Sequence, residues 1–103
     1  MAVFLVSFDL RKPERDYGPF FERLRRFTHA QLLESAWFVE SAWNAARIRD
    51  ELFEQMDPDD GLMVALMEGE AGWNRLKDDS DLWLLKRFSQ TGSPIRPDLD
   101  PEG

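Results

Sequence analysis

The chain has 103 residues, of which 43% are hydrophobic, and a net charge of −7 from 13 Lys and Arg against 20 Asp and Glu. This length and apolar content are enough for one domain with one core. The absence of cysteine excludes disulfides and thiolate metal sites, and the single histidine argues against a histidine-rich metal site or a Ser-His-Asp triad. The acidic balance disfavours a general nucleic-acid coat protein, whose affinity would come from neutralising phosphates.

No apolar stretch reaches the roughly 18 residues that a membrane span requires, and no basic leader precedes the apolar N-terminus. We therefore expect a cytoplasmic protein with neither a transmembrane helix nor a signal peptide.

The first ten residues form an apolar run that ends at Asp9-Leu10. Side chains this apolar on both faces predict a strand in the middle of a sheet. Asp9 would then lie at the C-terminal end of that strand, at the start of a polar loop over 11–18.

Pro19 suits the first turn of a helix over about 19–28, in which Phe20, Leu24 and Phe27 follow the i, i+4, i+7 spacing. Residues 31–41 are rich in β-favouring side chains and predict two short strands or one bent strand.

Asn44 is a suitable N-cap for a second helix, whose apolar line is Ile48, Leu52 and Met56. The Asp57-Pro58-Asp59-Asp60-Gly61 segment should stop this helix, since its spacing does not fit a calcium loop. Residues 62–67 are uniformly apolar and predict a strand that is covered on both faces or paired at an interface.

The expected order of strand, helix, two strands, helix and strand defines an α+β fold, the ferredoxin-like split βαβ sandwich (β-α-β-β-α-β). We expect a single domain over 1–88, with a core over 2–70 and a C-terminal extension over 71–88, followed by a mobile acidic tail over 89–103. In the extension, 68–72 should be a loop, and Asp81 would cap a helical turn or strand over 82–88.

Both helices should pack on one face of the sheet, so the opposite face must be covered by a second copy or by residues 73–88. Trp37, Trp73 and Trp83 lie outside the helical stripes, and they favour a homodimer that hides this face.

Three segments carry a resemblance to a known family: Val3–Leu10, followed by Asp16-Tyr17 and a helix; Leu33–Val39; and Asp60–Ala65. Over about residues 2–70 the chain resembles the CRISPR-associated Cas-two superfamily, and within it the small stand-alone SinR-like proteins that are related to the VapD toxins. The resemblance implies a homodimer in which Asp9 lies at the dimer axis and binds a divalent metal in nuclease members. It also matches Ser35 to the serine of the second-strand motif. The glutamine that usually precedes this serine by two residues is replaced by Leu33, and the second half of the chain lacks the family's basic surface.

The residues allow the chemistry to be weighed separately. Two symmetry-related Asp9 carboxylates, with waters or substrate phosphates, would hold Mg²⁺ for metal-dependent cleavage of a phosphodiester. Arg11, Lys12 and Arg15 would position phosphates. Alternatively, Asp9 accepts backbone N–H bonds and only shapes the loop, as aspartate commonly does.

Four functions remain open. The first is a Cas-two-like dimeric module with a nucleic-acid-linked role in binding or assembly. The second is a metal-dependent endonuclease or endoribonuclease that uses Asp9, Ser35 and Mg²⁺. The third is a protein–protein interaction module without nucleic-acid contact, and the fourth is a small-ligand binder with Trp73 and Trp83 as pocket walls.

Overall fold

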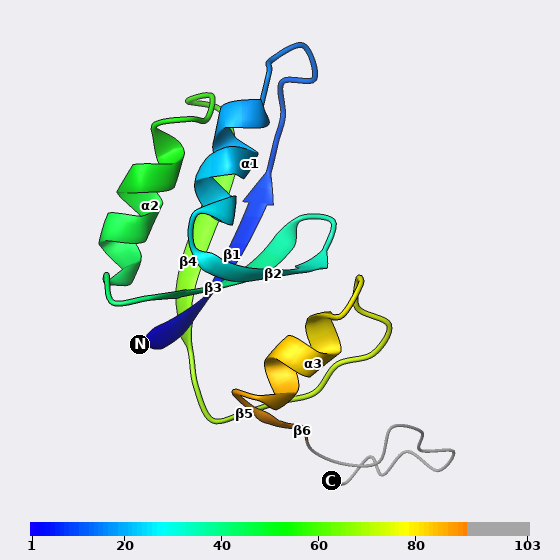
Figure 1. Ribbon diagram of the computed structural model, residues 1–103. Helices are drawn as coiled ribbons and strands as arrows, with labels where there is room; N and C mark the ends of the chain where they lie inside the picture. The colour runs from blue at the N-terminus through cyan, green and yellow to red at the C-terminus, as the bar shows by residue number, and fades with distance from the viewer. Residues whose placement is uncertain (91–103) are drawn as a thin grey trace, which may run out of the picture.

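The computed structural model describes residues 1–90, which form a four-stranded antiparallel sheet and three helices (Figure 1). The sheet has the order β2-β3-β1-β4 and consists of β1 (Ala2–Asp9), β2 (Thr28–Leu33), β3 (Ala36–Ser41) and β4 (Gly61–Met67). The remaining elements are α1 (Gly18–Arg25), α2 (Ala45–Phe53), α3 (Ser80–Leu85) and a parallel pair of short strands, β5 (Glu70–Ala71) and β6 (Ser89–Gln90). The order of elements through β4 is the expected one, and it is compatible with a ferredoxin-like α+β fold.

The first strand is interior, as its apolar sequence predicts. β1 pairs with β3 on one side and with β4 on the other. Phe4, Val6 and Phe8 are buried on the face toward α1 and α2, and Val3 is buried on the opposite face. Asp9 is the last residue of β1, opposite Gly61, and its side chain is exposed.

Helices α1 and α2 lie side by side on one face of the sheet (Figure 1). Phe20 and Leu24 of α1, with Ile48 and Leu52 of α2, are fully buried in the core of this face. The predicted cap of α2 is confirmed, because Oδ1 of Asn44 accepts a hydrogen bond from the N–H of Arg47 at 2.9 Å. The predicted helix over 19–28 is too long, since β2 already begins at Thr28, a β-branched residue that favours a strand.

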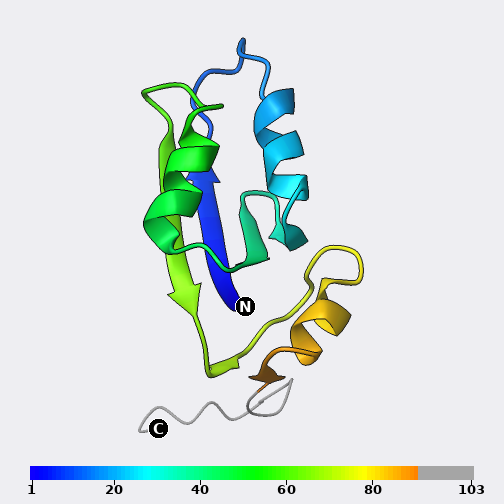
Figure 2. The same cartoon turned by 60° about the vertical axis from the view of Figure 1, so that its left-hand side comes forward.

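The C-terminal segment, residues 71–88, packs on part of the opposite face. Figure 2 shows α3 on the side of the sheet where β2 lies, away from α2. Leu84 and Phe88 pack with Val3 and Phe38 in a second apolar cluster, to which Trp73 and Trp83 also belong. Trp37, in contrast, lies on the other face, in the core under α1 and α2. Trp73 and Trp83 thus pack within the chain, and residues 73–88 cover part of this face, which is one of the two expected ways of covering it.

The same segment closes the outer edge of β2. The backbone N–H of Lys77 donates to the carbonyl of Leu32 at 3.0 Å, and Oγ of Ser80 donates to the carbonyl of Gln31 at 2.7 Å. The guanidinium of Arg87 also donates hydrogen bonds to both carboxylate oxygens of Glu40 on β3, at 3.0 and 3.3 Å.

The other edge of the sheet is bare. No strand within residues 1–90 pairs with the outer side of β4, and none of its seven residues is charged or fully buried. Met63 and Leu66 remain 54% and 53% exposed. β4 is thus an apolar edge strand with unpaired backbone groups.

Further elements differ in detail from the expectation. The expected loop over 68–72 contains β5, and Asp79 rather than Asp81 occupies the N-cap of α3. Of the expected mobile tail over 89–103, Ser89 and Gln90 form β6, and the rest lies outside the described residues. None of the described helices is long and apolar enough to cross a membrane.

Candidate functional site

The residues that the sequence singles out gather at one end of the sheet. Asp9 ends β1 there, and the loop that carries Arg11, Lys12 and Arg15 follows it. Ser35 lies in the turn between β2 and β3, where its carbonyl accepts a hydrogen bond from the N–H of Phe8 at 3.2 Å. The loop between α2 and β4 completes this end of the molecule.

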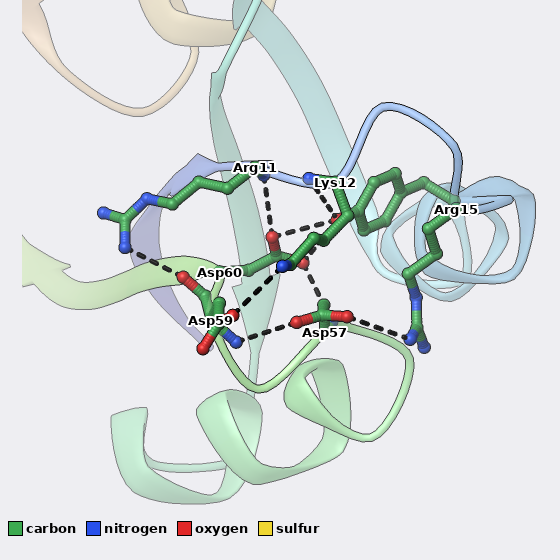
Figure 3. A network of polar contacts seen from close by, with 7 residues as sticks. Arg11, Lys12, Arg15, Asp57, Asp59 and Asp60 are labelled. Carbon is green, nitrogen blue, oxygen red and sulfur yellow. Dashed lines mark hydrogen bonds and ion pairs between the residues drawn. The ribbon is translucent and has the colours of Figure 1, made fainter.

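Asp60, in the loop before β4, is the centre of a polar network that joins these segments (Figure 3). Its Oδ1 accepts from the backbone N–H of Arg11 at 2.8 Å, and its Oδ2 accepts from the backbone N–H of Asp57 at 2.8 Å. The hydroxyl of Tyr17 lies 2.9 and 2.7 Å from the two oxygens. Asp60 is only 8% exposed. It therefore fixes the loop after β1 and the start of α1 to the loop before β4.

The environment shifts the pKa of three groups in and beside this network. Burial alone would raise the pKa of Asp60, but the hydrogen bonds from Arg11, Tyr17 and Asp57 outweigh it, so this pKa lies below its usual value. Burial, and then the hydrogen bond to Asp60, raise the pKa of Tyr17. The hydrogen bond to Asp59 raises the pKa of Lys12. At neutral pH the network thus holds an ionised Asp60 and a protonated tyrosine.

The three cations expected to hold phosphates all face acidic groups of the chain. The guanidinium of Arg11 contacts the carboxylate of Asp9 at 2.9 Å and the carbonyl of Asp59 at 2.8 Å. Lys12 pairs with Asp59 at 3.1 Å, and Arg15 lies 3.9 Å from Asp57. Exposed pairs of this kind contribute about 0–1 kcal/mol each, so a phosphate could displace them only where its own contacts are stronger.

The fit of a divalent metal to Asp9 can be judged from the donors around it. Within residues 1–90 there is no group of three or more His, Cys, Asp or Glu side chains that could hold a metal ion. The carboxylate of Asp9 already forms an ion pair with the guanidinium of Arg11. Mg²⁺ usually keeps several waters and is held by one or two carboxylates with substrate phosphates. Asp9 of one chain would therefore need waters, a substrate phosphate or the Asp9 of a second copy to hold this ion, and the ion would have to compete with Arg11.

Ser35 and the single histidine, His29, lie in different surroundings. Ser35 is exposed in its turn. His29 lies in β2, where its Nδ1 is 2.8 Å from the carbonyl of Phe27, and its ring packs on that of Trp37 with centroids 5.3 Å apart. His29 is thus remote in the fold from the Asp60 network, at the opposite end of α1.

The role of Asp60 was not predicted from the sequence, where residues 57–61 were interpreted only as a helix stop. α2 already ends at Phe53, before this segment, so the predicted apolar line of the helix extends too far at Met56. Within the segment, the N–H of Asp60 donates to the carbonyl of Asp57 at 2.9 Å. A signal was present in the position of Asp60 directly before the glycine that opens an apolar strand. A carboxylate at the start of this strand lies close to the backbone N–H groups of the neighbouring loops.

No family model and no solved structure matches the chain. The geometry of the described residues is therefore the basis for the function proposed below.

Proposed function

We propose that this chain is a homodimeric, Cas-two-like module with a ferredoxin-like fold, and that its role is assembly and binding rather than cleavage. The observation that carries the proposal is the contrast between the two edges of the sheet. β2 is closed by Lys77 and Ser80, whereas β4 presents an uncharged, apolar edge over its whole length.

Exposed edge strands pair readily with other strands, and natural proteins usually protect them with charges, prolines or bulges. β4 has none of the charges or prolines. Antiparallel pairing of β4 with β4 of a second copy would satisfy its backbone groups and merge the two sheets. It would also cover Met63 and Leu66, and each cross-strand pair contributes roughly 0.2–1 kcal/mol.

This dimer has a consequence for the nuclease alternative. If the two-fold axis passes near Val64, the middle residue of β4, each Gly61 faces Met67 of the second copy. Asp9 lies opposite Gly61, so the two Asp9 carboxylates would be about 20 Å apart along the strands, at about 3.4 Å per residue. They could not share one Mg²⁺. An endonuclease with Asp9 at the dimer axis requires a different dimer, and the two proposals exclude each other.

We place the nucleic-acid contact of the module at the end of α1 and the start of α2. Arg26 is exposed and makes no ion pair with a described residue, unlike Arg11, Lys12 and Arg15. Beside it, a cavity of about 390 Å³ is lined in part by Phe27 and Trp43, and the guanidinium of Arg47 lies 4.2 Å from the centroid of the Trp43 ring. An unpaired cation next to aromatic rings is suited to a phosphate and a stacked base.

Sedimentation equilibrium tests the dimer, with Leu66→Lys as the variant that places a charge on the bare edge. We expect a dimer for the natural chain and a folded monomer for Leu66→Lys. A Leu82→Lys variant is the matched control, because Leu82 is equally exposed, at 57%, but lies on α3. A natural chain that is monomeric at all concentrations, or a Leu66→Lys variant that still dimerises, would refute the edge as the interface.

Fluorescence anisotropy with labelled single- and double-stranded RNA and DNA at low salt tests the nucleic-acid contact. Arg26→Gln should weaken binding, and Lys12→Gln should leave it nearly unchanged because Lys12 is already paired with Asp59. A dimer that binds none of these RNA or DNA molecules would indicate the protein–protein interaction module instead. Cleavage that requires Mg²⁺ and is lost in Asp9→Ala would establish the endonuclease.

A further inference from the structure

A second cavity, of about 310 Å³, lies where the end of α1 and the outer edge of β2 meet the C-terminal segment. It is remote from both the Asp60 network and the β4 edge. One side of the cavity, called here the first side, is formed by Arg25, His29 and Trp37. The facing second side is formed by Asp78, Asp79 and Trp83. The two sides therefore carry opposite charges.

The first side holds polar groups that residues 1–90 leave without a partner. Arg25 forms no ion pair with any described residue, and its guanidinium lies about 6 Å from the rings of Phe21 and Trp37. Trp37 is only 2% exposed, yet its Nε1 has no acceptor within residues 1–90. A buried N–H without an acceptor costs roughly 1–3 kcal/mol, so it usually indicates a missing partner. Nδ1 of His29 contacts the carbonyl of Phe27, which leaves Nε2 for another group.

The second side offers two carboxylates that are likewise unpaired within residues 1–90. Asp78 and Asp79 form no ion pair there, and Asp79 occupies the N-cap position of α3 without a side-chain cap bond. Ser80 is engaged with the carbonyl of Gln31, which fixes this side of the cavity against β2. The ring of Trp83 adds an apolar wall. The guanidinium of Arg87, 3.6 Å from the ring centroid, and the ring of Phe38, with centroids 6.4 Å apart, hold it in place.

We propose that this cavity binds a small zwitterion with a carboxylate and an amine, of the class of a free α-amino acid. The carboxylate would accept from Arg25 beside the ring of Trp37, and the ammonium would lie against Asp78 and Asp79. Ligand cavities usually measure about 300–1,000 Å³, so a cavity at the lower end of that range fits a ligand of this size. A charge-assisted contact at each end would give the site its specificity.

The test is titration of the full-length protein, labelled with ¹⁵N, with each of the twenty free L-amino acids. The indole N–H signal of Trp37, assigned with a Trp37→Phe variant, reports on a ligand in the cavity because Trp37 lines it. We expect at least one amino acid to shift this signal in a saturable way. The same amino acid with its amine acetylated or its carboxylate amidated should bind more weakly, because each change removes one charged end.

Two variants locate the site. Arg25→Gln and Asp79→Asn should each weaken binding at least tenfold, the loss expected for one charge-assisted hydrogen bond. Asparagine is a good N-cap, so Asp79→Asn should leave α3 intact. Lys86→Gln is the matched control, since Lys86 is an exposed cation at the end of α3 that does not line this cavity.

The proposal is overturned if no amino acid shifts the Trp37 signal, or if binding survives Arg25→Gln and Asp79→Asn unchanged. Both readouts are independent of the oligomeric state. A failure here therefore leaves the dimer proposal standing, and the reverse also holds.

Discussion

Replacing Asp60 with asparagine removes the charge at the centre of the polar network while it keeps the shape of the side chain. Asp60 accepts from three donors: the N–H groups of Arg11 and Asp57 and the hydroxyl of Tyr17. Asparagine has one acceptor oxygen, and its NH₂ group would face one of these donors. A hydrogen bond to a charged group contributes about 1.5–3 kcal/mol, and an unsatisfied buried donor costs about 1–3 kcal/mol. We expect Asp60→Asn to lower the free energy of unfolding by about 3 kcal/mol.

Urea denaturation at neutral pH measures this loss, with Asp59→Asn as the matched control. Asp59 is exposed, and its ion pair with Lys12 should contribute less than about 1 kcal/mol. The pKa of Asp60 is lowered in the folded protein, so its ionised form stabilises the fold above the ordinary carboxyl pKa of about 4 and ceases to do so as the pH falls below it. The difference between the natural chain and Asp60→Asn should accordingly shrink below about pH 4. Equal losses for Asp60→Asn and Asp59→Asn would refute the assignment of Asp60 as the centre of the network.

Three further substitutions test the packing, the backbone conformation and one ion pair of the fold. Leu84→Ala should lower the free energy of unfolding by about 3 kcal/mol and change the fluorescence of the chain, because Leu84 is fully buried against the sheet. A decrease of less than about 1 kcal/mol would show that the C-terminal segment does not pack on the sheet. Gly69→Ala should destabilise more than Gly61→Ala in thermal unfolding, because Gly69 has a φ of +90°. A Cβ at Gly61 would come within 3.1 Å of the flexible guanidinium of Arg11 and make an ordinary contact with Cβ of Asp9 at 3.5 Å. The reverse order of stability would contradict this. The hydrogen bonds from Arg87 lower the pKa of Glu40, so Arg87→Gln should reduce the loss of stability that occurs as the pH falls below about 4, and an unchanged acid titration would speak against this pair.

Local patterns were sufficient to predict much of the fold. The apolar N-terminus defines an interior strand because both of its faces are buried, and Asn44 defines the start of α2 because its side chain can satisfy a backbone N–H three residues on. The end of α1 was harder to predict, since Phe27 fits the helical stripe although the chain has already turned toward β2.

The candidate site depends on contacts between distant segments, which the sequence does not display. The bonds of Asp60 to Arg11 and Tyr17 join residues 49 and 43 positions apart. The pairing of Arg11, Lys12 and Arg15 with acidic groups likewise arises only when the loop before β4 folds against them. The apolar run over 62–67 suggested an interface, but which edge of the sheet stays open is decided by the docking of the C-terminal segment on β2.

Disulfide trapping tests the central claim most directly, because the chain has no cysteine of its own. In an antiparallel pair about a two-fold axis near Val64, the two copies of residue 64 lie about 4.5–5.5 Å apart between Cα atoms, within the range that a disulfide spans. We expect Val64→Cys to form a covalent dimer rapidly under mild oxidation and Asp9→Cys to remain monomeric on a denaturing gel. Rapid cross-linking of Asp9→Cys, with none for Val64→Cys or its neighbours Met63→Cys and Ala65→Cys, would contradict the β4 dimer and place Asp9 at the axis.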